Sequence, residues 1–281
     1  MGTAPPLYLL ITRESEAFLD LTPEDRLPEY ENPPVAEVVT GVYFRKIPLQ
    51  LPHFGLLWKQ FQHDYPRFEE APPLITTIEQ SDTPDFPMPR VWFLSRDETG
   101  VIQVQNSYFL ANWRRVKADD AYPRYHRVME QYRDRLGRFS AFLESQSLPE
   151  IEPVHYEMTY VNHIPQGDGW NDLGDIGRVL PDLSWRKEPV RFFSGHETLN
   201  CVWGFSLPKG MGRLRVSVKT ARRRADDVPV LIMELTAKGK PEASASLDAW
   251  NWYSVAREWI VRGFADLTSS EVQETVWKRT G

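Results

Sequence analysis

Hydrophobic and polar positions in the first half of the chain predict an alternation of strands and helices. Residues 35–44 (VAEVVTGVYF) are rich in β-branched side chains, which favours a strand. Apolar residues at helical spacing predict a short helix over 53–65 and a long helix over 122–144. Two further β-rich stretches, 90–95 and 101–113, flank a turn and predict a hairpin.

Three features modify this pattern. Gly41 inside the first strand suggests a bulge or a close approach of two backbones. The Pro-rich stretch 66–89 is long for a connection inside a compact domain, and it predicts either an ordered wrap or a functional loop. Residues 1–32 form a lead-in, with a short strand predicted at 8–11 and a helix start at Thr22.

The second half of the chain repeats the order of the first half. Residues 153–165 (PVHYEMTYVNHIP) are a predicted strand opened by Pro-Val and closed by Ile-Pro, as is the stretch 34–48. A short helical segment near 173–180 comes next, then strands within 190–207, 213–219 and 230–237, and a closing helix over 246–265. An internal duplication explains this order, although chance recurrence of a common α+β order would produce it too.

The predicted fold class is therefore α+β. We expect two related strand-helix-strands-helix lobes that share a curved, mostly antiparallel sheet flanked by long helices. The predicted boundaries are 1–32 for the lead-in, 33–148 for the first lobe and 149–281 for the second lobe, in one compact unit.

Composition narrows the class of protein. The single cysteine, Cys201, excludes an intramolecular disulfide and a cysteine-type zinc site, and a cysteine within an apolar strand acts as a small hydrophobe. The start of the chain lacks a secretory signal pattern, and no apolar run approaches the ~20 residues of a membrane span, so we expect a cytoplasmic protein. The net charge of −6 argues against a dedicated nucleic-acid binder but leaves room for a local basic patch.

Several stretches together resemble a sporadically distributed, uncharacterised family of bacterial proteins of about this length. The resemblance covers nearly the whole chain from Leu27 onward. It implies no catalytic residues, and a patchy distribution is typical of defence or toxin-antitoxin components. The stretches are LPEYENPPVAEV (27–38), NWR (112–114), YPRY (122–125), YVNHI (160–164) and AREWIVRGFADLT (256–268).

Candidate chemistry is sparse. His155, Glu157 and His163 alternate onto one face of the strand at 153–165, but the strand separates the two histidines too widely for one zinc ion, which leaves a half-polar sheet face. We predict no catalytic residues, no metal site and no cofactor.

Two basic clusters stand out. Arg222, Arg223 and Arg224 form either a solvated hairpin tip or a contact for phosphates or an acidic partner. Arg114 and Arg115 follow Trp113, which is either a core residue or, if exposed, an interface anchor or base-stacking platform.

Three functions remain open from the sequence. The leading hypothesis is a non-enzymatic accessory factor that binds another protein in a bacterial defence or toxin-antitoxin setting. The second is a small-molecule-binding module with its cleft between the lobes. The third is nucleic-acid contact through the two Arg clusters. The candidate cleft residues are Glu37, Trp92, Trp113, Glu157 and Asn162.

The closing helix carries its own predictions. Its apolar residues lie on more than one side, so we expect Trp259 to be buried and Gly263 to mark a contact too close for a methyl group. Arg257 and Arg262 are expected to face solvent or to pair with acidic neighbours on the same helix.

Overall fold

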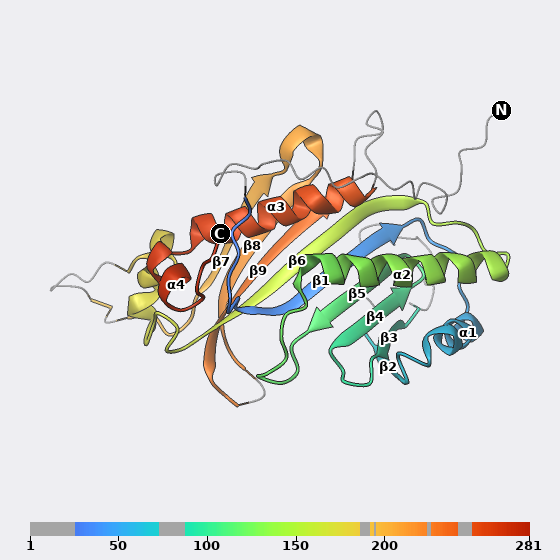
Figure 1. Ribbon diagram of the computed structural model, residues 1–281, viewed down its shortest axis with the longest axis horizontal. Coiled ribbons are helices and arrows are strands. Elements are labelled where there is room, and N and C mark those ends of the chain that lie inside the picture. The colour runs from blue at the N-terminus through green and yellow to red at the C-terminus, as the bar shows by residue number, and fades with distance from the viewer. Residues whose placement is uncertain (1–25, 73–87, 186–191, 194, 224–225, 241–248) are drawn as a thin grey trace.

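The chain folds around one open antiparallel sheet (Figure 1). This computed structural model describes residues 26–72, 88–185, 192–193, 195–223, 226–240 and 249–281. Nine strands pair in the order β2-β3-β4-β5-β1-β6-β9-β8-β7. The predicted elements at 8–11 and Thr22, and Arg224, lie outside the described residues. The strands are β1 (Val35–Phe44), β2 (Arg67–Ala71), β3 (Arg90–Leu94), β4 (Gly100–Gln105), β5 (Tyr108–Arg114), β6 (Pro153–Pro165), β7 (Asn200–Ser206), β8 (Arg213–Arg222) and β9 (Pro229–Gly239).

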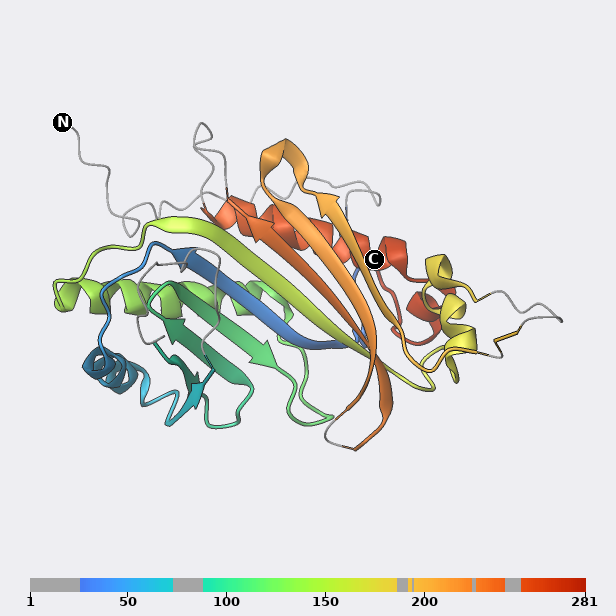
Figure 2. The ribbon, with the colours of Figure 1, turned by 180° about the vertical axis from the view of Figure 1, so that it is seen from behind.

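Two long helices cover one face of the sheet. Figure 1 shows α2 and α3 side by side in front of the strands. Figure 2 shows the opposite face of the sheet, which we call the second face; none of the described helices crosses the strands there. Within the described ranges, no helix combines the length and apolar character that a membrane span requires. The helices are α1 (Leu51–Phe61), α2 (Arg124–Ser145), α3 (Ala249–Leu267) and α4 (Ser270–Thr275), with short 3-10 turns η1 (Leu173–Arg178), η2 (Pro181–Leu183) and η3 (Pro208–Gly210).

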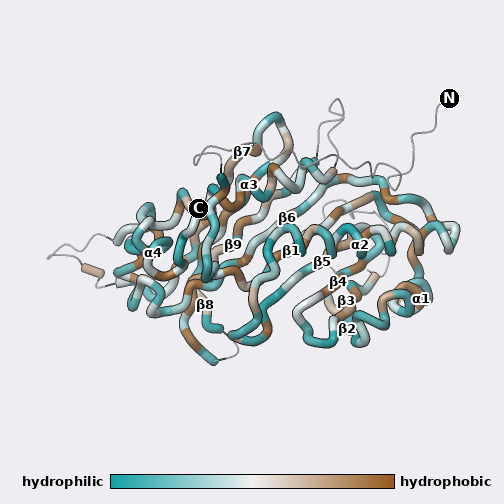
Figure 3. Tube along the Cα trace, in the orientation of Figure 1, coloured by the Kyte–Doolittle hydropathy of each residue, from teal (hydrophilic) through white to brown (hydrophobic). Residues whose placement is uncertain are grey.

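The two-residue period of the strands separates the core from the second face. On β1, Val38 and Val42 point to the helices and belong to the main core, whereas Tyr43 belongs to a small separate cluster on the second face. The tube in Figure 3 alternates between hydrophobic and hydrophilic along α2, as expected for a helix with one face on a sheet. Phe139 of α2 stacks on Phe109 of β5 with ring centroids 4.9 Å apart. Burial of each such side chain stabilises the fold by about 1.5–3 kcal/mol.

The structure corrects two strand predictions. The predicted strand at 101–113 is two strands, β4 and β5, because Asn106 and Ser107 form a tight turn between them. The stretch 66–89, predicted as a connection, begins with the edge strand β2; residues 73–87 lie outside the described residues. Both errors arise because a short polar turn inside a β-rich run, and a short charged edge strand, carry weak hydrophobic patterns.

The two glycine predictions have opposite outcomes. At Gly41 an added Cβ would overlap Leu110 and lie 2.9 Å from the Phe109 carbonyl oxygen, so the predicted close approach is confirmed. At Gly263 an added Cβ would lie 3.4 Å from Leu214 and 3.9 Å from Leu235, which is ordinary contact, so the predicted exclusion of a methyl group is wrong.

The closing helix buries different aromatic residues from those predicted. Trp259 is half-buried, and the fully buried rings of α3 are Trp252 and Tyr253. Arg262 pairs with Glu258 at 3.0 Å, as predicted. Arg257, by contrast, lies over an aromatic ring inside a cavity rather than toward an acidic neighbour.

Candidate functional site

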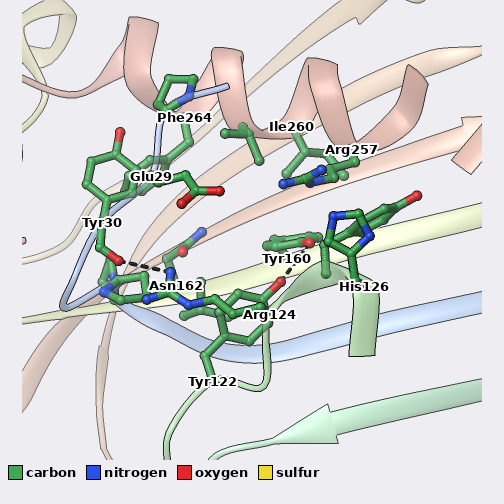
Figure 4. Close-up of a pocket in the computed structure, with 16 residues that line it drawn as sticks. Glu29, Tyr30, Tyr122, Arg124, His126, Tyr160, Asn162, Arg257, Ile260 and Phe264 are labelled. Carbon is green, nitrogen blue, oxygen red and sulfur yellow. Dashed lines mark hydrogen bonds between the residues drawn. The ribbon is translucent and has the colours of Figure 1, made fainter. Parts of the chain in front are cut away.

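A cavity of about 360 Å³ lies between the two long helices on the helix-covered side of the sheet (Figure 4). Residues from four separate parts of the chain line it: the segment before β1, the start of α2, the end of β6 and the middle of α3. Helix α2 belongs to the first half of the chain and α3 to the second half, so the cavity lies where the two halves meet.

Four tyrosines line it: Tyr30, Tyr122, Tyr125 and Tyr160. The hydroxyl groups of Tyr122 and Tyr160 are 2.9 Å apart and share a hydrogen bond. Burial raises the pKa of both phenols above the ordinary value of 10.0, and it raises the pKa of Tyr30 to about 12. The tyrosine part of the wall is therefore uncharged and combines apolar ring faces with hydroxyl groups, while Glu29, Arg124 and Arg257 bring charged groups to the same cavity.

Arg257 supplies the positive charge of the cavity. Its guanidinium carbon lies 4.4 Å from the centroid of the Tyr125 ring, within the range of a cation–π contact. Its charge lowers the pKa of Tyr122 and Tyr160, against the larger effect of burial. Among the described residues no carboxylate oxygen lies within 4.0 Å of Arg257. The carboxylate of Glu29 also lines the cavity, but among the described residues it forms no ion pair with Arg257, so Arg257 is a cation in an aromatic cavity without a paired carboxylate.

Arg124 provides a second cation at the rim. It is the first residue of α2, and its φ of 67° is uncommon for a residue other than glycine. Such a conformation costs about 1–3 kcal/mol and persists only where surrounding contacts hold it. Here its Nη1 donates to the carbonyl oxygen of Tyr30 at 2.9 Å, which ties the start of α2 to the segment before β1.

Asn162 is the one predicted cleft residue that lines this cavity. Its side chain is 3% exposed, and its Nδ2 donates to the Met233 carbonyl oxygen at 3.2 Å. Trp113 lies on the same side of the sheet but inside the core, 8% exposed, with its ring centroid 5.5 Å from that of Tyr122. Trp113 therefore supports the wall from behind, and of the two alternatives that the sequence left open the core position is confirmed.

The other predicted cleft residues lie on the second face of the sheet. Glu37 accepts a hydrogen bond from Asn112 at 2.5 Å, and burial raises its pKa. Glu157 pairs with Lys238 at 3.5 Å. Trp92 shares its row of the sheet with Glu157, but four strand spacings of about 4.8 Å separate them, or roughly 19 Å. The five predicted residues therefore do not meet in one cleft.

The two basic clusters do meet. Arg114 and Arg115 at the end of β5, and Arg222 and Arg223 at the end of β8, line one groove on the second face, together with Glu37. Among the described residues no group of three or more His, Cys, Asp or Glu side chains is placed to hold a metal ion.

The sequence interpretation did not single out Tyr122, Tyr160, Arg124 or Arg257 as site residues. A signal was nevertheless present, because the stretches 27–38, 122–125, 160–164 and 256–268, which carry the family resemblance, all contribute lining residues to the cavity. Only the fold shows that these distant stretches converge.

Comparison with known proteins adds no further assignment: no protein-family model and no curated protein matches this chain.

Proposed function

We propose that the protein is a binding module for a small molecule that carries an anionic group on an apolar body. The observation that supports this proposal is the placement of Arg257, a cation without a described acidic partner, among neutral tyrosines in a cavity. Cavities of about 300–1,000 Å³ with apolar walls and a few polar groups are typical of ligand sites.

The lining defines the chemistry of the ligand. An Arg guanidinium pairs bidentately with a carboxylate or a phosphate, and inside an apolar cavity this interaction is stronger than in water. The rings of Tyr30, Tyr160 and Phe264 favour an aromatic or branched aliphatic body. The hydroxyl groups of Tyr122 and Tyr160 can donate to a second oxygen of the ligand.

A thermal-shift series with matched probes tests the proposal. Phenylacetate and phenyl phosphate should raise the melting temperature of the protein, whereas uncharged phenylacetamide should not. A probe at ~100 times its dissociation constant stabilises the native state by about 2.7 kcal/mol. Arg257→Gln should abolish the shift. The matched control is Arg262→Gln on the same helix, because Arg262 pairs with Glu258 outside this cavity. Equal shifts in wild type and Arg257→Gln, or no shift with any anion, reject the proposal.

We also infer that the two halves arose by duplication. From the centre of the sheet outward, the first half reads β1-β5-β4-β3-β2 and the second half reads β6-β9-β8-β7. In each half the strand next to the central one, β5 or β9, is followed by a long helix, α2 or α3. This correspondence supports the inference, and on this proposal the ligand site would lie between the two duplicated halves.

Binding of another protein remains a second proposal, and the two edges of the sheet favour one location for it. Edge strand β2 carries Arg67, Glu69 and Glu70, the kind of charges that discourage pairing with another chain. Edge strand β7 has no charged residue, and it exposes Val202 at 51% and Phe205 at 39%. A defence or toxin-antitoxin setting for such a partner stays a prediction. Val202→Lys on β7 should abolish co-purification of a native-host partner, whereas Phe68→Lys on β2 should not.

A further inference from the structure

The groove on the second face of the sheet is a separate site from the tyrosine cavity. Its volume is about 700 Å³, and we call it the basic groove. The central strands form its floor with Val161, Val230 and Ile232. One wall is the segment after β5, residues 114–118, and the other wall is the end of β8, residues 219–223, with Asp226 of the following turn. Figures 1 and 2 both show these two segments next to each other at one end of the sheet.

Positive charge is concentrated in this groove on a chain whose net charge is −6. Of the described residues, six cationic side chains line it and two carboxylates, Glu37 and Asp226. Three of the cations already have acidic partners: Arg114 with Glu98 at 3.8 Å, Arg222 with Asp227 at 2.9 Å, and Arg223 with Asp226 at 2.6 Å. Within the described ranges, the remaining three have no carboxylate oxygen within 4.0 Å; they are Arg115, Lys117 and Lys219.

The cations of the two walls influence each other across the floor. Burial is the main cause that lowers the pKa of Arg115; the charge of Asp120 raises it, and the charge of Arg223 on the opposite wall lowers it. Between them lies His163 of β6, whose pKa is lowered by burial and then by Arg223 and Arg115. The charges of the two walls therefore add up over His163, and an anion there would relieve their repulsion.

We propose that the basic groove binds the phosphate backbone of a nucleic acid, without reading its sequence. The cations extend along both walls, over residues 114–118 and 219–223, and form a band whose positive charge exceeds the negative charge that one phosphate carries. A repeating polyanion matches such a band, because each phosphate neutralised releases counterions. Among the described residues the lining contains no Phe, Tyr or Trp, so these residues offer a base no large aromatic ring to stack on. This absence favours backbone contacts over binding of a free nucleotide or of unpaired bases.

Fluorescence anisotropy with the full chain tests the proposal. The probes are labelled 20-base-pair DNA duplexes of two unrelated sequences, with unlabelled ATP and polyglutamate as competitors. We expect equal affinity for the two sequences and a roughly 150- to 2,000-fold loss between 50 and 200 mM salt, for about four to six phosphate contacts at a log–log slope of about −0.9 per contact. Arg115→Gln and Lys219→Gln should each reduce the steepness of this slope by about 1. Both side chains are exposed, so these variants should keep the fold.

Two control variants separate this site from others. Arg127→Gln removes the same charge from the outer surface of α2, where Arg127 pairs with Glu130, and it should bind as wild type. Arg257→Gln in the tyrosine cavity should also bind DNA as wild type, so failure here is distinguishable from failure of the small-molecule proposal. The proposal is overturned by absence of binding at 50 mM salt, or by an unchanged slope in Arg115→Gln and Lys219→Gln. It is equally overturned if ATP displaces the duplex at matched phosphate concentration, which indicates a free nucleotide, or if polyglutamate does so at matched charge, which indicates an acidic protein.

Discussion

The tyrosine cavity and the basic groove both depend on arginine, yet they surround it differently. In the cavity, Arg257 lies against the ring of Tyr125, between two helices that pack on the sheet. In the groove, Arg115 is exposed and shares its surroundings with five other cations. A cation held against an aromatic ring makes a single directional contact, whereas several exposed cations around one groove are each screened by salt and act through their number.

This difference has a structural origin. The cavity residues come from elements fixed by the main core, including Tyr160, which is 5% exposed. The groove cations sit at the ends of β5 and β8 and beyond them, where side chains reach into solvent. Shape and burial should therefore decide binding in the cavity, and net charge should decide binding in the groove.

The largest expected effect comes from deleting a buried ring of α3, the helix that also carries Arg257. Trp252 of α3 is fully buried, and its Nε1 donates to the Met211 carbonyl oxygen at 2.9 Å. Trp252→Ala should lower the free energy of unfolding by about 3–5 kcal/mol, as is usual for deleting a large buried ring. Lys219→Ala in the groove should change it by less than about 0.5 kcal/mol. Urea titration of both purified variants measures the contrast, and a large loss in Lys219→Ala would show that the groove contributes to the core.

Exchanging arginine for lysine sharpens the comparison at the level of binding. Arg257→Lys keeps the charge but removes the planar guanidinium from the Tyr125 ring, so phenylacetate affinity should fall about tenfold. Arg115→Lys keeps a point charge in an open groove, so duplex affinity should stay within about twofold of wild type. Calorimetry for the first variant and anisotropy for the second give the two ratios. If lysine lowered the affinity by the same factor at both sites, the planar guanidinium would not be what distinguishes the cavity from the groove.

The pH dependence of stability tests His155, which lies on the second face of the sheet. Burial, and to a lesser degree the charge of Lys238, lowers the pKa of His155 to about 4 from 6.5. The unfolded chain therefore binds more protons than the folded chain between pH 6.5 and about 4, and stability present above pH 6.5 is lost as the pH falls through this window. The loss should be on the order of 1 kcal/mol, because the ring is only half-buried and solvent screens its charge. His155→Gln removes this titration, so its stability should fall less than that of wild type between pH 7 and pH 4.5 (urea midpoints at each pH). Acidic groups whose pKa is raised in the fold, such as Glu37, favour the folded state as the pH falls. They are present in both wild type and His155→Gln, so they do not affect the difference between the two.

The smallest expected effect is a gain in stability at the edge of α3. Gly263→Ala places a methyl group in ordinary contact with Leu214 and removes the helix-interior cost of glycine, so stability should rise by up to about 1 kcal/mol. Gly41→Ala should do the reverse, because its methyl group would overlap Leu110 on the adjacent strand. Thermal unfolding of the two variants checks both signs, and the cavity should bind phenylacetate unchanged in Gly263→Ala.

The sequence by itself determined the elements with strong periodicity and the polarity of their faces. The β-branched run at 35–44 forms β1, and the apolar stripe of 122–144 forms most of α2, because local pattern decides which side of an element can be buried. The close approach at Gly41 was also readable, since glycine inside a strand leaves room for a neighbouring backbone.

Only the tertiary structure decided which residues share a site. Tyr122 and Tyr160 are 38 positions apart, and Arg115 and Arg223 are 108 positions apart; strand pairing brings each pair together. The same pairing divided the predicted cleft residues, because one-residue steps along a strand send side chains to opposite faces. Asn162 thus lies in the cavity while Glu157 lies behind the sheet. The position of a residue in a strand predicts which face of the sheet its side chain is on. The distance between two residues on different strands depends on the order of the strands in the sheet, and long-range packing decides that order.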